Sequence, residues 1–264
     1  MLRLKGSVIR AVSLDCQGTL FHHRASIESV YARLAVPILP EAPTAEEFKS
    51  AFSQSYAETL KGFPFYRFPT QEPAVYSTRR WWRELCRRSL ELTGRVYTDE
   101  QIDRFFRAVY QHYGSSLGYV AFPDATEFLE KLSPLKVVVG VTSNCSTRTI
   151  DTTLPNLLMH DKMHYFTCSQ EAGCDKPSLH IFARTLDAIR VITPDIQKNQ
   201  VLHIGTSITN DFAAAREFGF QALLLDRDGA SGAQRAASDD LHLEHHLETS
   251  TVTSLREVGE RLGC

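Results

Sequence analysis

The sequence lacks the features that mark membrane, nucleic-acid-binding and secreted proteins. No apolar run approaches the roughly 18 residues needed to cross a bilayer, so we expect no membrane partner. The 29 basic and 31 acidic residues are mixed along the chain without a basic block, which argues against a nucleic-acid partner. The first expected strand begins by about Val8 and leaves no room for a cleavable presequence, so we expect a cytoplasmic protein.

The six cysteines are scattered, and no C-x-x-C pair occurs among them. That pattern fits reduced thiols better than a disulfide framework or a zinc site. The chain of 264 residues is 43% hydrophobic, which is enough to bury the core of one large domain or two modest ones. No internal repeat or low-complexity segment is present. We therefore expect a globular protein whose partner is a small molecule.

Short apolar runs rich in β-branched residues alternate with helical segments. The runs are apolar almost throughout, which is typical of a parallel sheet covered on both faces. Helices are expected after Pro123, over 147–158, after Pro177, and over 211–218, where Gly219 ends the last one. This alternation predicts a doubly wound α/β fold. The expected strands are VIRAVSLD (8–15), KVVVGVTSN (136–144), YFTCS (165–169), VLHIGT (201–206) and QALLLD (221–226).

Residues 22–118 break the alternation and have the pattern of a helical insertion. Thr44 with Glu47 and Thr98 with Gln101 have the spacing of capping boxes, which predicts helices that begin after each threonine. A third helix is expected over 77–94, and the proline-rich stretch 62–73 is expected to be a loop. We therefore predict an α/β core formed by 1–21 and 119–264, with the helical domain 22–118 inserted after the first strand.

Polar side chains follow the ends of four expected strands. In a doubly wound sheet, ligands bind outside the carboxyl ends of the strands, so these side chains are expected to converge. An acid, hydroxyls, a cation and a second acid would then share one site. The residues are Asp15, Gln17 and Thr19 after the first strand, Thr142, Ser143 and Asn144 after the second, Lys176 after the third, and Gly205, Thr206, Asn210 and Asp211 after the fourth.

This arrangement resembles the haloacid dehalogenase (HAD) superfamily. The superfamily pattern is D-x-D-G-T, then S/T often followed by Asn, then K often followed by Pro, then G-D with a further Asp. The chain offers DCQGT (15–19), Ser143-Asn144, Lys176-Pro177, and Gly205-Thr206 followed by Asp211. The insertion 22–118 falls where the superfamily places its helical C1 cap. The resemblance therefore covers essentially the whole chain.

The resemblance implies a role for each matching residue. Asp15 would be the nucleophile that forms a covalent aspartyl intermediate. Thr19 and Ser143, the latter followed by Asn144, would hold the oxygens of the transferred group, and Lys176 would offset negative charge. In metal-dependent members, Asp15 and the backbone carbonyl of residue 17 ligate Mg²⁺. Asp211 would hold the metal through water.

The chain departs from the phosphatase pattern at two positions. In that pattern, position 17 carries the acid that protonates the leaving oxygen. Gln17 is an amide and has no acidic proton to give near neutral pH. Loss of a positioned general acid costs on the order of 10²–10⁴ in rate. Position 206 carries an acid that ligates Mg²⁺, and Thr206 is a weaker ligand for that hard cation. We therefore expect weak or absent Mg²⁺ binding.

Three functions remain open from the sequence. The first is a weak or degenerate phosphohydrolase that acts through Asp15 on a small phosphorylated metabolite. The second is a metal-independent 2-haloacid dehalogenase, whose halide leaving group needs no general acid, although Lys49 and Ser50 stand near the place where those enzymes hold halide with an arginine. The third is a non-catalytic binding module that holds a phosphorylated ligand without turnover. The insertion would supply specificity.

Within the insertion, Arg79, Arg80, Trp81 and Trp82 are candidates to face the site. Adjacent tryptophans are more often one core and one rim residue, and we expect that arrangement for Trp81 and Trp82.

Overall fold

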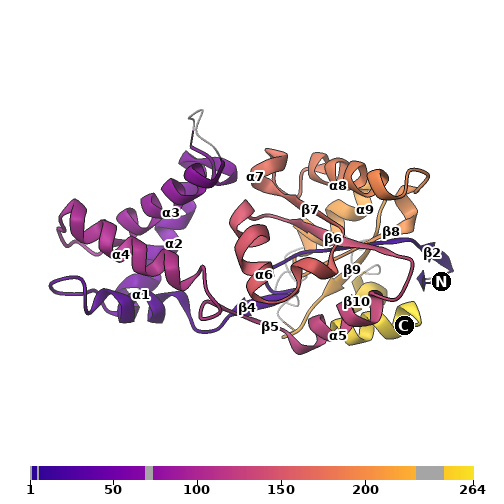
Figure 1. Cartoon of the computed structure of the whole chain (residues 1–264), viewed down its shortest axis with the longest axis horizontal. Helices are drawn as coiled ribbons and strands as arrows, with labels where there is room; N and C mark the ends of the chain where they lie inside the picture. The colour runs from indigo at the N-terminus through magenta and orange to yellow at the C-terminus, as the bar shows by residue number, and fades with distance from the viewer. Residues whose placement is uncertain (1, 5, 69–73, 230–246) are drawn as a thin grey trace. The chain divides into compact units, whose positions relative to one another are not determined.

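The computed structural model describes residues 2–4, 6–68, 74–229 and 247–264 (Figure 1). The chain divides into two compact units. The first comprises 1–22, 121–144 and 158–264, and the second comprises 23–120 and 145–157. The predicted division placed 145–157 with the α/β core, whereas in the structure these residues make most of their contacts within the second unit.

A six-stranded sheet forms the centre of the first unit. Its order is β10-β9-β8-β3-β6-β7, and every neighbouring pair is parallel. Such a sheet, with helices between its strands, confirms the predicted doubly wound α/β fold. The strands are β3 (Ala11–Leu14), β6 (Val138–Ser143), β7 (Tyr165–Cys168), β8 (Val201–Gly205), β9 (Gln221–Leu225) and β10 (Thr251–Val252).

Helices cover both faces of this sheet. Figure 1 shows α8 (Leu179–Ile192) and α9 (Ala214–Phe218) on one side of it, with α5 (Pro123–Leu132) and the yellow α12 (Leu255–Leu262) on the other. The short α7 (Ser169–Ala172) follows β7, and 3₁₀ turns occupy η3 (His160–Lys162) and η4 (Lys198–Gln200). Every residue of β3, β6 and β8 is buried, which explains why the sequences of these strands are apolar almost throughout.

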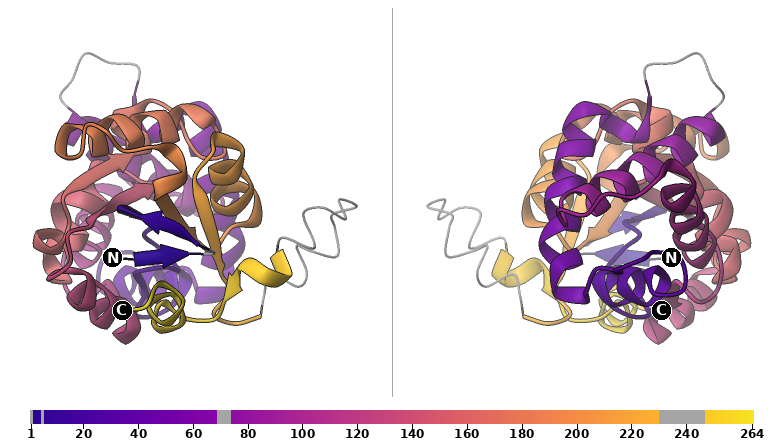
Figure 2. Two further views of the ribbon diagram at one scale, coloured as in Figure 1. Left: turned by 90° about the vertical axis from the view of Figure 1, so that its right-hand side faces the viewer. Right: turned by 90° about the vertical axis from the view of Figure 1, so that its left-hand side faces the viewer.

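The first predicted strand, 8–15, is two strands in the structure. β2 (Ser7–Ile9) pairs antiparallel with β1 (Leu2–Leu4), and Figure 2 shows the two as adjacent indigo arrows. Arg10 lies between β2 and β3, and its guanidinium pairs with Asp195, 2.8 Å away. The two helices predicted over 147–158 and 211–218 each begin with a π turn. The first consists of η2 (Thr149–Thr153) followed by α6 (Leu154–Asn156), and the second of η5 (Ile208–Ala213) followed by α9.

The second unit is helical. It contains α1 (Ile27–Ala35), α2 (Ala45–Gly62), η1 (Pro64–Tyr66), α3 (Ala74–Glu91) and α4 (Asp99–His112), together with η2 and α6. Both predicted capping boxes are present, at Thr44 and at Thr98, which explains where α2 and α4 start. The predicted loop 62–73 contains η1, and its residues 69–73 lie outside the described part of the chain.

Two short strands lie where the chain passes between the units. They are β4 (Phe21–His23) and β5 (Tyr119–Ala121), which form a two-stranded sheet. No strand was predicted in this region, because three residues are too few to show an alternating pattern.

The adjacent tryptophans take the expected pair of environments. Trp81 is fully buried, and its indole N–H donates to Phe63 O at 2.8 Å. Trp82 is half-buried and meets Trp81 edge-on with 4.9 Å between ring centroids. Trp81 therefore anchors the contact between α3 and the end of α2, as a core residue rather than as a ligand-facing one.

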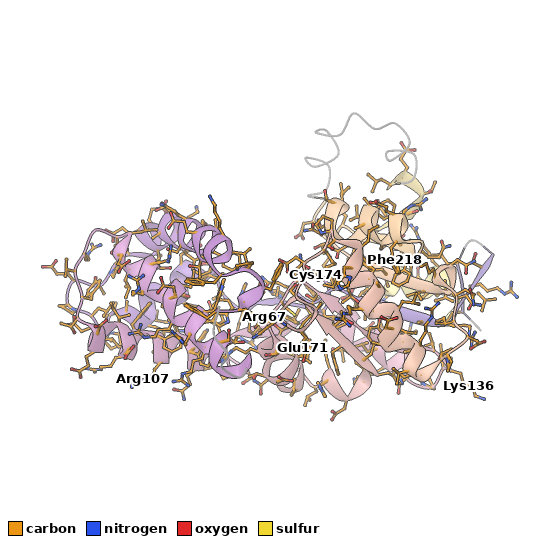
Figure 3. All side chains as sticks on the ribbon, turned by 90° about the horizontal axis from the view of Figure 1, so that it is seen from above. Arg67, Arg107, Lys136, Glu171, Cys174 and Phe218 are labelled. Atoms are coloured by element: carbon orange, nitrogen blue, oxygen red, sulfur yellow. The ribbon has the colours of Figure 1, made fainter. Side chains whose placement is uncertain are left out.

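None of the six cysteines is in a disulfide, which agrees with the predicted reduced thiols. Four are buried, and Cys174 (Figure 3) and Cys264 are half-buried. Among the described helices, none is both long enough and apolar enough to cross a membrane.

The packing of α8 on the sheet can be tested with two substitutions on that helix. Ile189 is fully buried, and Val191 is 85% exposed. We expect Ile189→Ala to lower the free energy of unfolding by about 2–5 kcal/mol, because it removes a buried side chain and leaves a cavity. Val191→Ala should change it by less than about 0.5 kcal/mol. Urea denaturation measures both, and equal losses would show that α8 does not pack as described.

Candidate functional site

The carboxyl ends of three adjacent strands bring the predicted residues of the first unit together. β3 lies between β8 and β6, so Asp15, Gly205 and Ser143 stand at one edge of the sheet. The amide of Asp15 still donates to Ile204 O at 2.9 Å, which fixes the first residue after β3 to β8. The carboxylate of Asp15 is 15% exposed and can be reached by a ligand.

Lys176 connects the two acids of the site. Its ammonium donates to Asp15 Oδ1 at 2.8 Å, to Asp211 Oδ1 at 2.5 Å and to Thr142 O at 3.0 Å. These three bonds use all the hydrogens of the ammonium, and only 2% of the side chain is exposed. The sequence-predicted Asp15, Lys176 and Asp211 are thus in direct contact.

Asn144 fixes the backbone from which Lys176 extends. The amide Nδ2 of Asn144 donates to Lys176 O at 2.9 Å, and its Oδ1 accepts from Lys176 N at 2.7 Å. Two bonds to one residue hold that residue against rotation as well as translation. Asn144 therefore positions the lysine, and Ser143 beside it is buried at the end of β6.

The charges at this edge depend on one another. Burial lowers the pKa of Lys176, but the Asp15 and Asp211 carboxylates outweigh that effect and hold the pKa well above its usual value. Burial likewise raises the pKa of Asp211, and the nearby Lys176 and His203 outweigh it, so the pKa lies well below its usual range. The site therefore contains an ammonium and an ionised Asp211 throughout the physiological pH range.

Both oxygens of the Asp211 carboxylate contact protein groups. Oδ1 accepts from Lys176 and lies 3.1 Å from His203 Nε2, and Oδ2 accepts from Ser207 N at 2.9 Å. The side chain is 3% exposed. A Cβ at Gly205 would overlap this carboxylate, so glycine is required there for Asp211 to approach β8.

His203 is a site residue that was not predicted from the sequence. It is fully buried in β8, its Nδ1 lies 2.9 Å from Ser13 Oγ, and burial lowers its pKa. Ser13 continues the contact to Thr142 at 2.8 Å, and Thr142 to Thr185 on α8 at 2.7 Å. The signal in the sequence was a histidine inside an otherwise apolar strand, a position that requires a buried partner.

In the loop after β3, the hydroxyl of Thr19 is buried and the side chain of Gln17 is exposed. Thr19 is fully buried, and its Oγ1 has no hydrogen-bond partner among the described residues. A buried hydroxyl without a partner is costly, so this donor is available to a bound ligand. Gln17 is exposed. Gly18 between them has φ of 82°, which favours glycine, and a Cβ there would lie 3.3 Å from Thr206 Cγ2.

Arg227 holds this loop from behind and was not predicted either. Its guanidinium donates to Gly18 O at 3.2 Å, to Thr19 O at 2.9 Å and to Asp124 Oδ2 at 2.8 Å. Arg227 follows β9 and stands more than 200 residues from the loop in sequence, so no local pattern indicates the contact.

The donor set does not fit the Mg²⁺ site implied by the resemblance. Both carboxylate oxygens of Asp211 already contact Lys176, His203 or Ser207. The acid that the phosphatase pattern has at position 206 is replaced by Thr206. Of the predicted ligands, only Asp15 and the backbone carbonyl of Gln17 remain. Within the described ranges, no cluster of three or more His, Cys, Asp or Glu side chains could hold a metal ion. Mg²⁺ favours carboxylates in near-octahedral geometry, which one carboxylate and one carbonyl supply poorly.

Comparison with known proteins shows which family the chain belongs to. The sequence profile of the haloacid dehalogenase-like hydrolases matches residues 9–219, which include every residue of the predicted site. The chain belongs to this family. Within it, the chain is 24% identical to haloacid dehalogenase-like hydrolase domain-containing protein 3 of Xenopus laevis, over 82% of this chain and 84% of that protein.

A further relative is a phosphatase, and a solved structure resembles this chain in fold. A ribulose-1,5-bisphosphate 5-phosphatase of Halopiger xanaduensis is 29% identical over 131 residues, which are 48% of this chain and 52% of that enzyme. A crystal structure of the HAD hydrolase YfnB of Bacillus subtilis, bound to magnesium, aligns with a TM-score of 0.63 at 14% identity, over 98% of this chain and 100% of that one. The structural likeness establishes a shared fold.

The contact between Lys176 and the two acids can be tested by removing the ammonium. We expect Lys176→Met to lower the free energy of unfolding by about 3–5 kcal/mol at pH 7, because it leaves Asp211 buried without its cation. Without the cation, the Asp211–His203 pair has a raised affinity for a proton in the folded state. The deficit relative to wild type should therefore be largest near pH 8 and shrink as the pH falls towards 5.

Urea denaturation across this pH range measures the effect. Lys162→Met is the matched control, since Lys162 forms a surface pair with Glu130 at 3.0 Å and should cost less than about 1 kcal/mol at every pH. A deficit of Lys176→Met that does not change with pH would contradict the described charge arrangement.

Proposed function

We propose that this HAD-family hydrolase is a slow phosphohydrolase that acts through Asp15 on a small phosphorylated metabolite. The observation that carries the proposal is the placement of Asp15, which is partly exposed at the end of β3 with one oxygen on Lys176 and the other directed to no partner in the described contacts. A carboxylate held in this way is oriented for attack. The 29% identity to a sugar-bisphosphate phosphatase supports the same class of substrate.

The reaction proceeds in two balanced steps. An oxygen of Asp15 bonds to phosphorus while the bond from phosphorus to the leaving oxygen breaks, and the electron pair departs with that oxygen. Water then attacks the phosphorus of the aspartyl phosphate, which releases phosphate and a proton and restores the carboxylate. Lys176 offsets the charge of the nucleophile, and the unpartnered hydroxyl of Thr19, with Ser143, donates to the phosphoryl oxygens.

Gln17 limits the rate in this scheme. It cannot protonate the leaving oxygen, so an alkyl ester must depart as an alkoxide. From a typical turnover of about 10 s⁻¹, a loss on the order of 10⁴ leaves about 10⁻³ s⁻¹. Esters with acidic leaving groups escape most of this loss. The donor set around Asp211 provides no good metal site, so the scheme contains no step through Mg²⁺.

A second candidate reaction follows from the same observation. Displacement of halide from carbon needs neither a metal nor a general acid. This matches a site in which Asp211 contacts Lys176, His203 and Ser207, and in which Gln17 replaces the acid. Asp15 would bond to the carbon as halide departs with its electron pair, and water would hydrolyse the resulting ester to a hydroxy acid. We infer for either reaction that the helical second unit is the cap that supplies specificity.

Hydrolysis of p-nitrophenyl phosphate by the purified protein tests the proposal. We expect slow turnover that is insensitive to EDTA and is abolished by Asp15→Asn, whereas the exposed acid variant Asp187→Asn on α8 should be unaffected. The double variant Gln17→Asp/Thr206→Asp should turn over faster and should respond to Mg²⁺, because Thr206→Asp restores a carboxylate ligand.

Different results would redirect the proposal. Turnover that survives Asp15→Asn would exclude the aspartyl nucleophile. Wild-type turnover that requires Mg²⁺ would contradict the metal-free scheme. Halide release from a 2-halo acid in EDTA, with no phosphatase activity, would favour the second candidate. Thermal stabilisation by phosphate without either activity, lost in Lys176→Met, would indicate a binding module.

A further inference from the structure

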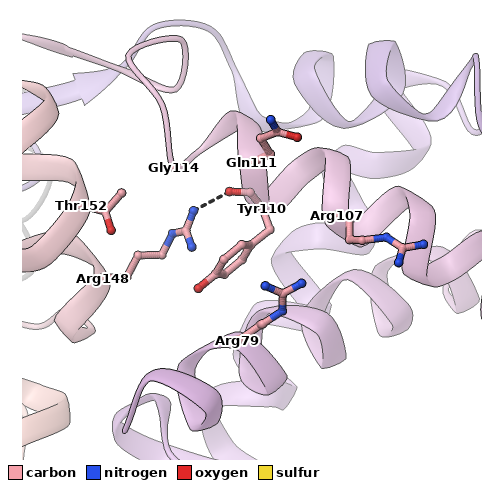
Figure 4. A pocket seen from close by; sticks show the side chains of 7 residues that line it. All are labelled: Arg79, Arg107, Tyr110, Gln111, Gly114, Arg148 and Thr152. Atoms are coloured by element: carbon pink, nitrogen blue, oxygen red, sulfur yellow. Dashed lines mark hydrogen bonds between the residues drawn. The ribbon is translucent and has the colours of Figure 1, made fainter.

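A basic pocket lies within the second unit, formed by α3, α4 and the segment 148–152. Its volume is about 380 Å³. The lining contains three guanidinium groups, a phenol ring, an amide and a hydroxyl, and no carboxylate. The lining residues are Arg79, Arg107, Tyr110, Gln111, Gly114, Arg148 and Thr152 (Figure 4).

Two of these arginines are arranged around one ring. The Cζ of Arg148 lies 3.3 Å from the centroid of Tyr110, and the Cζ of Arg79 lies 5.4 Å from the same centroid. In Figure 4 both guanidinium groups approach Tyr110, whereas that of Arg107 points away from it. The π-face of a tyrosine attracts cations, so the ring fixes both groups beside the pocket.

The guanidinium of Arg148 lies directly against the backbone at Tyr110 and Gly114. The Nη2 of Arg148 donates to Tyr110 O at 2.5 Å, and Asn156 Nδ2 donates to Gly114 O at 3.0 Å. A Cβ at residue 114 would overlap Nη2 of Arg148, so glycine is required for this approach. Arg148 is therefore a positioned side chain rather than a freely extended one.

The pocket carries uncompensated positive charge. Within the described part of the chain, neither Arg79 nor Arg148 makes an ion pair, and Asp151, next to the lining Thr152, does not line the pocket. Their charges stand at most roughly 9 Å apart, because both contact one ring, and this is comparable to the screening length of about 8 Å at physiological ionic strength. A bound anion would relieve the repulsion that the two charges exert on each other.

We propose that this pocket binds a small oxyanion of the phosphate class. A guanidinium presents paired N–H donors that match the oxygens of phosphate, and two guanidinium groups with the hydroxyl of Thr152 can surround one such group. The volume exceeds that of a single phosphate, so the ligand is a phosphorylated small molecule or a diphosphate. None of the lining residues belongs to the group around Asp15 and Lys176, and the proposal does not depend on the proposed function.

Calorimetric titration with inorganic pyrophosphate, without added metal, tests the proposal. We expect the wild type to bind the probe, and Arg148→Gln and Arg79→Gln each to weaken binding by about tenfold or more. Gly114→Ala should weaken it as well, without a change of charge, because the added methyl displaces Arg148.

A control variant distinguishes binding in this pocket from binding elsewhere on the protein. Arg83→Gln removes the same charge one turn along α3, where Arg83 pairs with Asp103 at 2.6 Å, and it should leave affinity within about twofold. The proposal is overturned if the wild type does not bind, or if Arg83→Gln weakens binding as much as Arg148→Gln.

Discussion

One ammonium group holds the candidate active site together. Lys176 contacts Asp15, Asp211 and a backbone carbonyl at once, and it is buried with them. Two carboxylates could not share this edge of the sheet without a cation, since the energy of each buried charge depends on its partner. Three further features hold the cation and the acids in position. They are the hydrogen bonds from Asn144 to Lys176, the glycine at 205, and the buried His203.

The two departures from the phosphatase pattern lie on adjoining segments. Gly18 follows Gln17, and a Cβ at Gly18 would touch the methyl of Thr206. Where the phosphatase pattern has two more carboxylates, this chain has an amide and a hydroxyl. The substitutions thus lower the negative charge of the edge by two together. With fewer acids, a cation supplied by the protein can balance the site, and the demand for a metal falls.

Elements whose determining chemistry is local could be predicted from the sequence. Thr44 and Thr98 begin helices because their caps close over three residues, and Asp15 and Ser143 end strands because apolar runs stop there. Features that depend on a partner far along the chain could not be predicted. Arg10 pairs with Asp195, the ring of His203 lies beside the Asp211 carboxylate, and Arg227 donates to the carbonyl of Gly18 near the start of the chain. The split of the chain at 145–157 also depends on contacts that no local pattern records.

The contact made by Arg227 extends the functional unit beyond the family motifs. The family profile ends at residue 219, yet the carbonyls of Gly18 and Thr19 are held by a guanidinium that follows β9. Asp124, which orients that guanidinium, also accepts from the amide of Leu255 at the start of α12. The nucleophile loop is therefore tied to the last helix of the chain. The smallest fragment able to keep that loop in shape is longer than the stretch by which the family is recognised.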